Sequence, residues 1–476
     1  MAHPMSARLP LLNLAPLPAV LPLLLLTACQ PVGPDHRTPA MDLPASFSDG
    51  GVRWKRQSAE TQPKPQSWWR LFGDSTLNSL VDRGLSNNQE LAGASARLQQ
   101  ARDLSRAART RFFPAIALNA NGERTQSRFR GPGGGSLLQN NYSVPIDFSY
   151  EIDFWGKVRR QVESATAAEA ASRESLNGMR LTIAGEIAQT YWALRAVDAD
   201  RQLLDETLAI RRKALDLLTR QRDAGAISDL DLSRAQTEVS TAESDRIGLD
   251  RDRVELVNAL AVLTGSTTTG SSVPESSKLP GPPSVPGSIP SELLRQRPDI
   301  RAAEHRVAAA NADIGVATAM FYPSITLNAS GGFDAPVFNQ LFDADALVWS
   351  LGAGISQPIS GHGLLRAQRD AAVSAHQAAS ADYRQTVLIA LREVENALQG
   401  TTILARREKA QQDAVNAARK TFDLSSKRFK AGLVSFLDVV DSERTRLDAE
   451  RGLNAIRAER LAISVSLIKS LGGEWR

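Results

Sequence analysis

One segment occurs twice in this chain, and its repetition constrains the fold more than any other feature. Phe112 to Gly122 (FFPAIALNANG) returns as Phe321 to Gly331 (FYPSITLNASG). Each copy follows a run with helical periodicity and opens a segment in which apolar and polar residues alternate. Such a recurrence predicts two tandem structural repeats. In each copy a proline would end the preceding helix, because proline lacks the amide proton that helix continuation requires.

The segments after the repeated motif are predicted to be strands with one apolar and one polar face. Between Tyr142 and Phe154 every even position is apolar, and the odd positions carry Ser, Pro, Asp or Glu. Strict alternation of this kind is typical of a strand that separates two environments. A weaker partner strand covers Ile116 to Ala120, and a glycine-rich tip at residues 130–135 would close the hairpin. The predicted lipid-facing positions are Tyr142, Val144, Ile146, Phe148, Tyr150, Ile152 and Phe154 in the first repeat, and Leu347, Trp349, Leu351 and Ile355 in the second.

Each hairpin is followed by a very long helical run, a sharp turn and a return helix. A continuous helix of about 65 residues would be roughly 100 Å long. The turns share the pattern Ala-Gly-x-x-Ser-x-Leu-Asp. Glycine ends the incoming helix, and serine with an aspartate three residues later caps the outgoing one. The turn residues are Gly225 and Ser228 in the first repeat, and Gly432, Ser435 and Asp438 in the second.

These patterns divide the chain into six parts. We predict a signal peptide at 1–28, an extended segment at 29–73, repeat 1 at 74–265, a Ser/Pro-rich linker at 266–290 and repeat 2 at 291–473. Repeat 1 would hold a β-hairpin at about 115–154 and a helical hairpin at about 156–263. Repeat 2 would hold the same elements at about 324–358 and about 363–470. The last residues fall outside the repeats.

Composition excludes several functions. Lys and Arg number 56 and Asp and Glu 52, so the net charge is +4, and the charges are interspersed. That distribution gives no basic patch for nucleic acid. The five histidines are scattered, and the single cysteine excludes an intrachain disulfide. We therefore expect no catalytic site, no metal and no cofactor, and we do not expect an enzyme.

The one cysteine, Cys29, lies at the end of a secretory signal. Arg8 precedes an apolar run from Leu9 to Leu26, which ends in Leu-Thr-Ala-Cys. A basic start, an apolar stretch and small residues before the cut are signal-peptide features. The ending is similar to a bacterial lipobox, so Cys29 would become the acylated first residue of the mature protein. An ordinary signal peptide with an incidental cysteine is the alternative.

Beyond Cys29 no apolar run reaches the roughly 18 residues of a membrane helix, so strands would have to span any membrane. The four visible strands cannot close a barrel, and unpaired strand edges are not tolerated in lipid. Several chains would have to pool their hairpins, and three would give twelve strands. Two or four chains would also give an even number. Strands of this kind more often form a β-sandwich. Here a sandwich is disfavoured, because the sequence predicts only four strands and they are divided between the two repeats.

The chain resembles the TolC/OprM-type outer membrane factors, especially their lipoprotein branch of OprM-like or NodT-type efflux channels. The resemblance rests on the lipobox followed by Val-Gly-Pro-Asp at 32–35, on the Trp-Trp-x-x-Phe-x-Asp-x-x-Leu run at 68–77, on Arg-Pro-Asp-Ile at 297–300, and on the two Ala-Gly turns. These motifs cover essentially all of the mature chain in the family's order.

The resemblance implies a homotrimer with a twelve-stranded outer-membrane β-barrel and a long periplasmic α-helical barrel. The trimer would be the passive exit duct of a tripartite efflux system that carries drugs or toxic compounds. Its partners would be outer-membrane lipid, a periplasmic adaptor protein and an inner-membrane RND-type pump. The protein would be lipid-anchored in the cell outer membrane, with most of its mass in the periplasm.

By the same resemblance, a periplasmic gate would lie near the second helical turn. The matching positions are Leu437, Asp441, Arg444, Arg428 and Phe429. Other interpretations stay open: Asp438 is more simply a capping carboxylate, and Asp441 with Arg444 could be an exposed pair one helical turn apart. The acidic residues on the polar strand face are more simply hydrated than cation-selective.

Two other functions remain as alternatives. The chain could be the exit channel of a type I protein-secretion system, although the lipobox and the Trp-Trp run favour small-molecule efflux. It could also be a coiled-coil lipoprotein that only scaffolds the envelope. The apolar strand face argues against a scaffold, which would have no use for it.

Overall fold

The computed structural model describes residues 31–41, 67–128, 135–283 and 296–473. The chain divides into two compact units. One contains residues 1–38, 101–169 and 306–379, and the other contains residues 39–100, 170–305 and 380–476. Two long helices, α4 (Lys157–Asp223) and α8 (His362–Lys430), contribute to both units.

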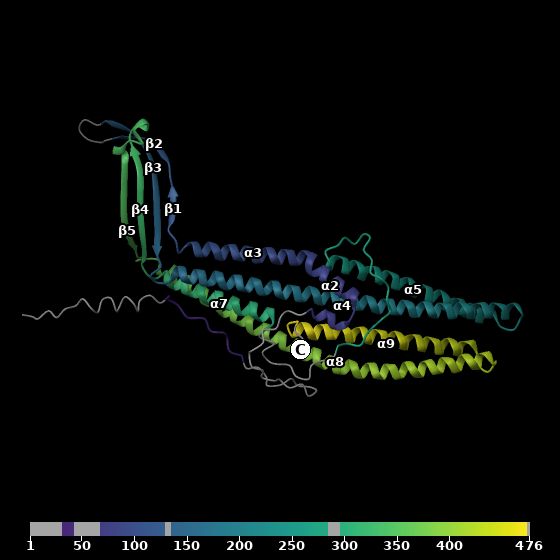
Figure 1. Cartoon of the computed structure of the whole chain (residues 1–476). Coiled ribbons are helices and arrows are strands. Elements are labelled where there is room, and N and C mark those ends of the chain that lie inside the picture. Colours follow the sequence, from purple (N-terminus) through teal and green to yellow (C-terminus); the bar gives the residue numbers. More distant parts are fainter. Residues whose placement is uncertain (1–30, 42–66, 129–134, 284–295, 474–476) are drawn as a thin grey trace, which may run out of the picture. The chain divides into compact units, whose positions relative to one another are not determined.

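The first unit contains an antiparallel sheet in the order β1-β3-β4-β5, with β2 also paired to β3 (Figure 1). Its strands are β1 (Ala115–Leu118), β2 (Asn121–Arg128), β3 (Ser136–Ile152), β4 (Ser324–Ala335) and β5 (Leu347–Ser356). Strand β3 pairs with β4 through the register Tyr142↔Ala335 to Ile152↔Ile325, which joins the two repeats in one sheet. The paired strands therefore come from residues about 180 positions apart.

The edge strand of the first hairpin is longer than the sequence predicted. We expected it at Ile116 to Ala120, but β1 and β2 together follow β3 as far as Arg128. The amide of Asn119 donates to the carbonyl of Pro145 (3.0 Å) across the break between them. The predicted strand was too short because β2 is polar on both faces and therefore shows no alternation of apolar and polar residues. Backbone pairing with β3 holds β2 in the sheet. The predicted glycine-rich tip at 130–135 lies outside the described residues apart from Gly135.

The second hairpin is closed by an ordered loop with two short 3-10 turns, η2 (Phe338–Gln340) and η3 (Ala344–Ala346). In this loop Leu341 and Ala346 are buried together with Ala335 at the end of β4. Tyr142, Val144 and Phe333 of the sheet pack against them. The loop therefore covers one end of the apolar strand face with side chains of the same chain.

The shorter helices are η1 (Trp68–Phe72), α2 (Ser75–Asn87), α3 (Gln89–Thr110) and α7 (Pro298–Ala319). Asp74, which precedes Ser-Thr-Leu at 75–77 in the manner of an N-cap residue, caps α2 and accepts hydrogen bonds from the amides of Thr76 and Leu77 at 2.9 Å each. Asn88 separates α2 from α3, and its side chain accepts from the amides of Glu90 and Leu91. Both caps satisfy amides that the first helical turn leaves without partners.

Two helical hairpins dominate the second unit (Figure 1): α4 with α5 (Asp229–Leu263), and α8 with α9 (Phe436–Ser470). Gly225 and Gly432 lie at φ 73° and 72°, a left-handed conformation that suits glycine. Ser228 and Ser435 then cap the outgoing helices. Ion pairs hold each hairpin together, such as Arg246–Asp205 at 2.8 Å in the first and Arg457–Glu408 at 3.0 Å in the second.

The largest hydrophobic core of this unit forms around η1, α2 and the middle of α4. Trp68 meets both Trp69 and Phe72 edge to face, and Phe72 packs against Trp192, which is fully buried. The core continues to Val465 and Ile468 of α9. It therefore joins the N-terminal residues of the unit to both hairpins. Within the part of the chain that the structure describes, no helix is long and apolar enough to span a bilayer.

Candidate functional site

The predicted site residues fall into two groups, the strand face in the first unit and the second helical turn in the second unit. The strand face follows from the pairing register, because residues directly opposite each other on neighbouring antiparallel strands point to the same side. Four strands contribute in register: Leu118 faces Ile146, Ile146 faces Gly331, and Gly331 faces Trp349. The next apolar row runs from Ile116 through Phe148 and Ala329 to Leu351.

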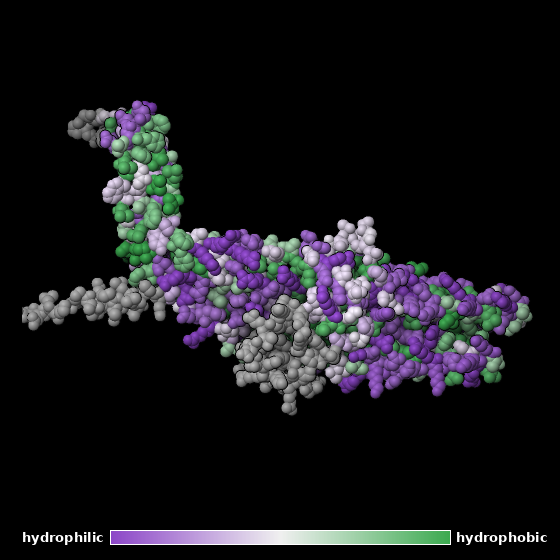
Figure 2. All heavy atoms as spheres, viewed as in Figure 1, coloured by the Kyte–Doolittle hydropathy of each residue, from purple (hydrophilic) through white to green (hydrophobic). Residues whose placement is uncertain are grey.

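This apolar face is largely open in the single chain. Trp349, Leu351 and Ile355 are 80%, 77% and 74% exposed, and Ile146 is 53% exposed. Figure 2 shows hydrophobic residues gathered along the sheet, whereas hydrophilic residues cover much of the visible surface of the long helices. From Tyr142 to Ile152 the apolar stretch has the length of a membrane-spanning strand, which needs about 9–11 residues. An exposed apolar face of this length is compatible with contact with lipid.

The opposite face of the same sheet is polar. Asp147 accepts a hydrogen bond from the side-chain amide of Asn119 (2.7 Å), and Ser149 donates to Asn328 (3.1 Å). In the register Asp147 lies opposite Ser330, which itself lies opposite Ser350. The face is thus made of short hydroxyl, amide and carboxylate groups, which suit contact with water.

Two residues of the predicted lipid face are placed differently. Phe154 lies beyond β3, which ends at Ile152, so its assignment to the strand is wrong. Its ring packs edge-on against Trp155 (4.8 Å between centroids), which stacks on Tyr322 (4.6 Å). Alternation continued in the sequence past the point where strand pairing stops. Tyr142 is in the strand, but Phe338 of the second hairpin loop partly covers it.

The sheet has two free edges. Among the described residues no further strand pairs with β5 or with the outer side of β1 and β2. A strand edge presents unpaired amides and carbonyls, which cannot remain unsatisfied in lipid. The sheet is therefore one section of a structure that other strands must complete.

At the second helical turn, Ser435 and Asp438 form a capping box. The Ser435 hydroxyl accepts from the amide of Asp438, whose carboxylate accepts from the amide of Ser435 at 2.9 Å. The Ser435 hydroxyl also donates to this carboxylate at 2.7 Å. This hydrogen bond, together with the one from the Ser435 amide, stabilises the carboxylate and lowers the pKa of Asp438 below its usual range. Asp438 thus serves as the capping carboxylate.

The gate candidates do not gather in one cluster. Leu437 is 55% exposed, Asp441 and Arg428 are exposed, and Phe429 packs against Phe436 (5.8 Å between centroids). Within the described chain Arg444 pairs with Glu238 of α5 rather than with Asp441, its Nε lying 3.2 Å from the carboxylate. The exposed Asp441–Arg444 pair considered from the sequence is therefore not what the structure forms.

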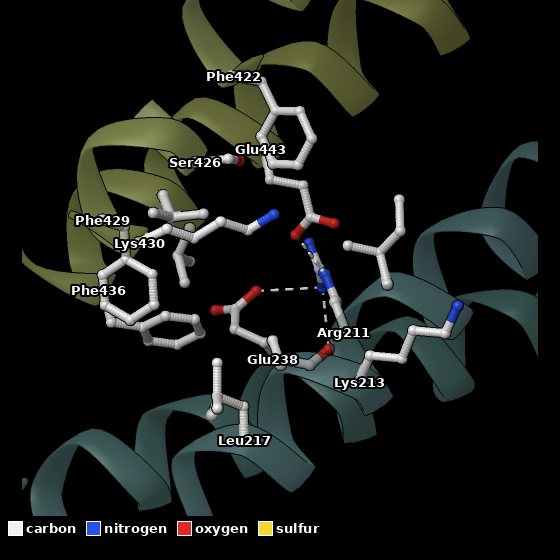
Figure 3. Close-up of a pocket in the computed structure, with 15 residues that line it drawn as sticks. Arg211, Lys213, Leu217, Glu238, Phe422, Ser426, Phe429, Lys430, Phe436 and Glu443 are labelled. Carbon is white, nitrogen blue, oxygen red and sulfur yellow. Dashed lines mark hydrogen bonds and ion pairs between the residues drawn. The ribbon is translucent and has the colours of Figure 1, made fainter. Parts of the chain in front are cut away.

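The sequence prediction missed three buried charged residues beneath this turn, Arg211, Glu238 and Glu443 (Figure 3). Arg211 of α4 donates through Nε to Glu443 of α9 at 2.8 Å, and its Nη1 lies 3.1 Å from the Glu238 carboxylate. Together with Arg444 on Glu238, these pairs join the first helical hairpin to the second. Burial raises the pKa of Glu443 above its usual value, an effect that the neighbouring Arg211 opposes.

A pattern in the sequence could have found them. The apolar stripe of α4 runs through Leu204, Leu208, Leu215 and Leu218, and Arg211 occupies the step between Leu208 and Leu215. In α9, Glu443 likewise follows Val440 and precedes Leu447. A charged residue at a stripe position must be buried, and buried charges need partners.

The Val-Gly-Pro-Asp motif forms a second site that was not predicted, in the first unit. The buried side chain of Arg160 donates to the carbonyls of Val32 and Gly33, and it pairs with Asp35 at 3.0 Å. Gly33 contacts Gly315 of α7 so closely that an added Cβ would come within 2.5 Å of the Gly315 Cα. Residues 31–35 are thus fixed to α4 and α7. Cys29 itself lies outside the described residues.

In the part of the chain that the structure describes, no three His, Cys, Asp or Glu side chains are grouped as a metal site would require. The buried carboxylates are held by arginines.

Solved structures with the same fold define the class of protein: membrane channels of the bacterial outer membrane. The outer-membrane channel OprN matches with a TM-score of 0.85 and 31% identity, covering 93% of this chain and 99% of that chain. The open-state MtrE outer membrane channel of Neisseria gonorrhoeae matches with a TM-score of 0.76 and 26% identity, covering 93% and 98%. The TolC/OprM-type fold predicted from the sequence is confirmed.

The sequence comparisons then give the family. The model of the outer membrane efflux protein family matches residues 80–266 and 289–473, once in each repeat, and the chain belongs to this family. The solvent efflux pump outer membrane protein SrpC of Pseudomonas putida is 32% identical over 460 residues, covering 95% of this chain and 97% of that protein. The toluene efflux pump outer membrane protein TtgC of Pseudomonas putida is 31% identical over 449 residues, covering 93% and 92%.

The predicted function and location follow from this membership. The chain is an outer-membrane efflux protein and a component of an efflux pump system. Family and fold are those of channel proteins.

Proposed function

We propose that three copies of this chain form a closed twelve-stranded barrel that conducts small molecules passively out of the periplasm. The observation that carries this proposal is the sheet with one exposed apolar face, one polar face and two free edges. Counting β1 and β2 as one edge strand, each copy provides four strands, so three copies provide twelve. The polar face then lines a water-filled passage, and β5 of each copy pairs with β1 and β2 of the next.

The partners we propose are a periplasmic adaptor and an inner-membrane pump of the RND type, which supplies the energy. Support comes from the relatives, whose names place them in solvent, toluene and antibiotic efflux pumps. We infer a similar cargo for this chain: organic solvents, drugs and other small toxic compounds. We propose that the duct itself catalyses no reaction.

We further propose that Cys29 carries a covalent lipid that anchors the mature chain in the outer membrane. The docking of residues 31–35 on Arg160 supports this, because it holds the chain beside the periplasmic end of β3 only two residues after the cysteine. The amide of Val32 donates to the carbonyl of Trp155 (3.0 Å), close to where β3 gives way to α4.

The gate proposed at the second turn comprises Leu437 and Asp441 of α9, with Arg428 and Phe429 of α8 nearby. The exposure of Leu437, Asp441 and Arg428 supports this, since a constriction made by several copies needs side chains that point away from their own chain. Arg444 contributes through its ion pair with Glu238, which fixes α9 to α5.

Solvent tolerance in cells would test the proposal. A strain that retains its adaptor and pump but lacks its outer-membrane channel should regain toluene tolerance when this chain is expressed from a plasmid. The same chain with Leu351→Arg on the apolar strand face should fail to restore it. Restoration by neither form, with the wild type present in the outer membrane as a trimer, would contradict efflux of aromatic solvents.

A further inference from the structure

A cavity of about 420 Å³ lies between the two helical hairpins, close to the second turn (Figure 3). All four long helices α4, α5, α8 and α9 contribute to its walls. Its volume is in the range of sites that hold small organic molecules. The apolar side chains that line it include Leu217, Ala235, Phe422, Phe429, Phe436 and Val440.

The walls of this cavity are mainly aromatic and aliphatic. Figure 3 shows the rings of Phe422, Phe429 and Phe436 on one side of the space, with Leu217 on α4 across from Phe436. The ring centroids of Phe429 and Phe436 lie 5.8 Å apart, and the ring planes meet at 56°. The two rings therefore offer a bound molecule surfaces of different inclination. Water in such a space finds few hydrogen-bond partners, and a molecule that displaces poorly ordered water gains affinity.

Two kinds of charged residue line the cavity. Arg211 binds both Glu443 and Glu238, and Glu238 also accepts from Arg444 outside the cavity. Two lysines, Lys213 and Lys430, also line it. A cationic ligand would have to lose its hydration beside these lysines, while the carboxylates are already bound by arginines, which is costly. The cavity therefore selects against cationic ligands.

We propose that this cavity is a binding site for one small aromatic molecule that carries no positive charge. The site is separate from the strand face, and it does not depend on which compounds the duct carries. Because its walls come from both hairpins, a bound molecule fills the space between them and stabilises the arrangement in which Arg211 and Arg444 hold them together.

A cysteine placed inside the cavity reports occupancy there and nowhere else. We would introduce Ser426→Cys, on the cavity wall, into the full-length protein assembled in lipid nanodiscs, and follow its reaction with a small thiol reagent. Ser425→Cys, on the same helix but not lining the cavity, is the matched control, and the wild type gives the background of Cys29. The probes are 1-naphthol, which is uncharged at neutral pH, and the 1-naphthylmethylammonium ion, which has the same rings with a positive charge.

At about ten times its dissociation constant, 1-naphthol should slow modification of Ser426→Cys about tenfold and leave Ser425→Cys unchanged. The ammonium ion should protect neither. Adding Phe429→Ala to Ser426→Cys should raise the half-protecting concentration of 1-naphthol about tenfold, because one aromatic wall is lost.

Three results would overturn the proposal. Equal effects of 1-naphthol on the two cysteines would mean that it does not bind in the cavity. Equal protection by the ammonium ion would remove the selection against cationic molecules. A thiol at position 426 that never reacts in the assembled protein, with or without 1-naphthol, would mean that a neighbouring copy fills the cavity.

Discussion

At the scale of single residues, charge placed inside an apolar stripe distinguishes this chain from a simple coiled coil. Arg211, Glu238 and Glu443 are each less than 10% exposed, yet they join three different helices. Buried ion pairs add little net stability, but breaking one leaves an uncompensated charge. These ion pairs therefore fix which helices pack together near the second turn. They also fix how these helices are aligned along their axes.

The pH dependence of stability should report on Glu443. Burial raises its folded-state pKa above the ordinary value of 4.5, so the group contributes stability below that pH and loses it as the pH rises through the folded pKa. Glu443→Gln stays neutral and cannot lose this contribution. The stability of Glu443→Gln relative to wild type should therefore increase between pH 4.5 and pH 7, by about 1 kcal/mol for each unit of pKa shift. Thermal unfolding across this range would measure it, and a difference that stayed constant or decreased would contradict the assignment.

Asp441→Ala should raise the conductance of the protein in planar bilayers, because it removes an exposed carboxylate at the proposed constriction. Asp448→Ala is the matched control, one heptad further along the same face of α9 and also exposed, and it should leave conductance unchanged. Unchanged conductance in Asp441→Ala would remove Asp441 from the gate.

Short sequence patterns predicted the roles of some residues, but they carry no information about the roles of others. The capping role of Asp438 follows from a four-residue pattern, and so does that of Asp74. The partner of Arg444 could not be found in this way, because Glu238 lies 206 positions earlier in the sequence. Such a pairing depends on how the two hairpins pack, which no local periodicity encodes.

At the scale of secondary-structure elements, the repeated segment joins a helix to a strand in each repeat. Helix α3 ends at Thr110 and β1 begins at Ala115, and α7 ends at Ala319 before β4 begins at Ser324. Alternation and helical periodicity predicted the types and order of these elements. They failed at two ends, where β2 is polar on both faces and where alternation persists to Phe154 beyond the last strand pair.

Docking of the N-terminal segment on α4 and α7 should depend on the absence of a side chain at Gly315. A Cβ there would lie 2.7 Å from the Arg160 Cγ and 2.9 Å from the Val32 carbonyl oxygen. Gly315→Ala should cost about 1–3 kcal/mol and loosen residues 31–35, so that trypsin cleaves after Arg37 about tenfold faster. Limited proteolysis followed by mass spectrometry would measure this rate.

Gly248→Ala is the control for that experiment, because a Cβ at this position of α5 would meet nothing within 4 Å. It should leave cleavage after Arg37 unchanged and stabilise the helix by about 0.5–1 kcal/mol. Equal cleavage rates in Gly315→Ala and wild type would show that close packing at Gly315 does not hold the segment.

At the scale of the whole molecule, one chain is an incomplete membrane structure. Its apolar strand face is exposed and its sheet edges are free, although its own register is fully determined by the pairing of β3 with β4. The sequence indicated that several chains must pool strands, but parity did not select three. The number of copies is set by curvature and by edge geometry, which one chain does not encode in its periodicity.

A charged residue placed on either face of β5 should show which face contacts lipid and which contacts water. Leu351→Arg should cost about 2–4 kcal/mol of membrane stability if the residue lies near the middle of the bilayer, and should reduce the amount of protein in outer-membrane fractions. Ser350→Arg, next to it on the polar face, should be tolerated. Equal losses in the two variants, measured by immunoblotting of fractionated membranes, would contradict the assignment of the faces.

The most direct test of the central claim is cross-linking between the free edges of the sheet. Chains that carry Leu351→Cys on β5 together with Ile116→Cys or Leu118→Cys on β1 should, at one of these registers, form disulfides from copy to copy in outer membranes. Denaturing electrophoresis should then show a covalently closed trimer, and each single substitution should give none. A product that stops at a dimer, or a ladder that extends beyond three copies, would contradict a twelve-stranded barrel built from three chains.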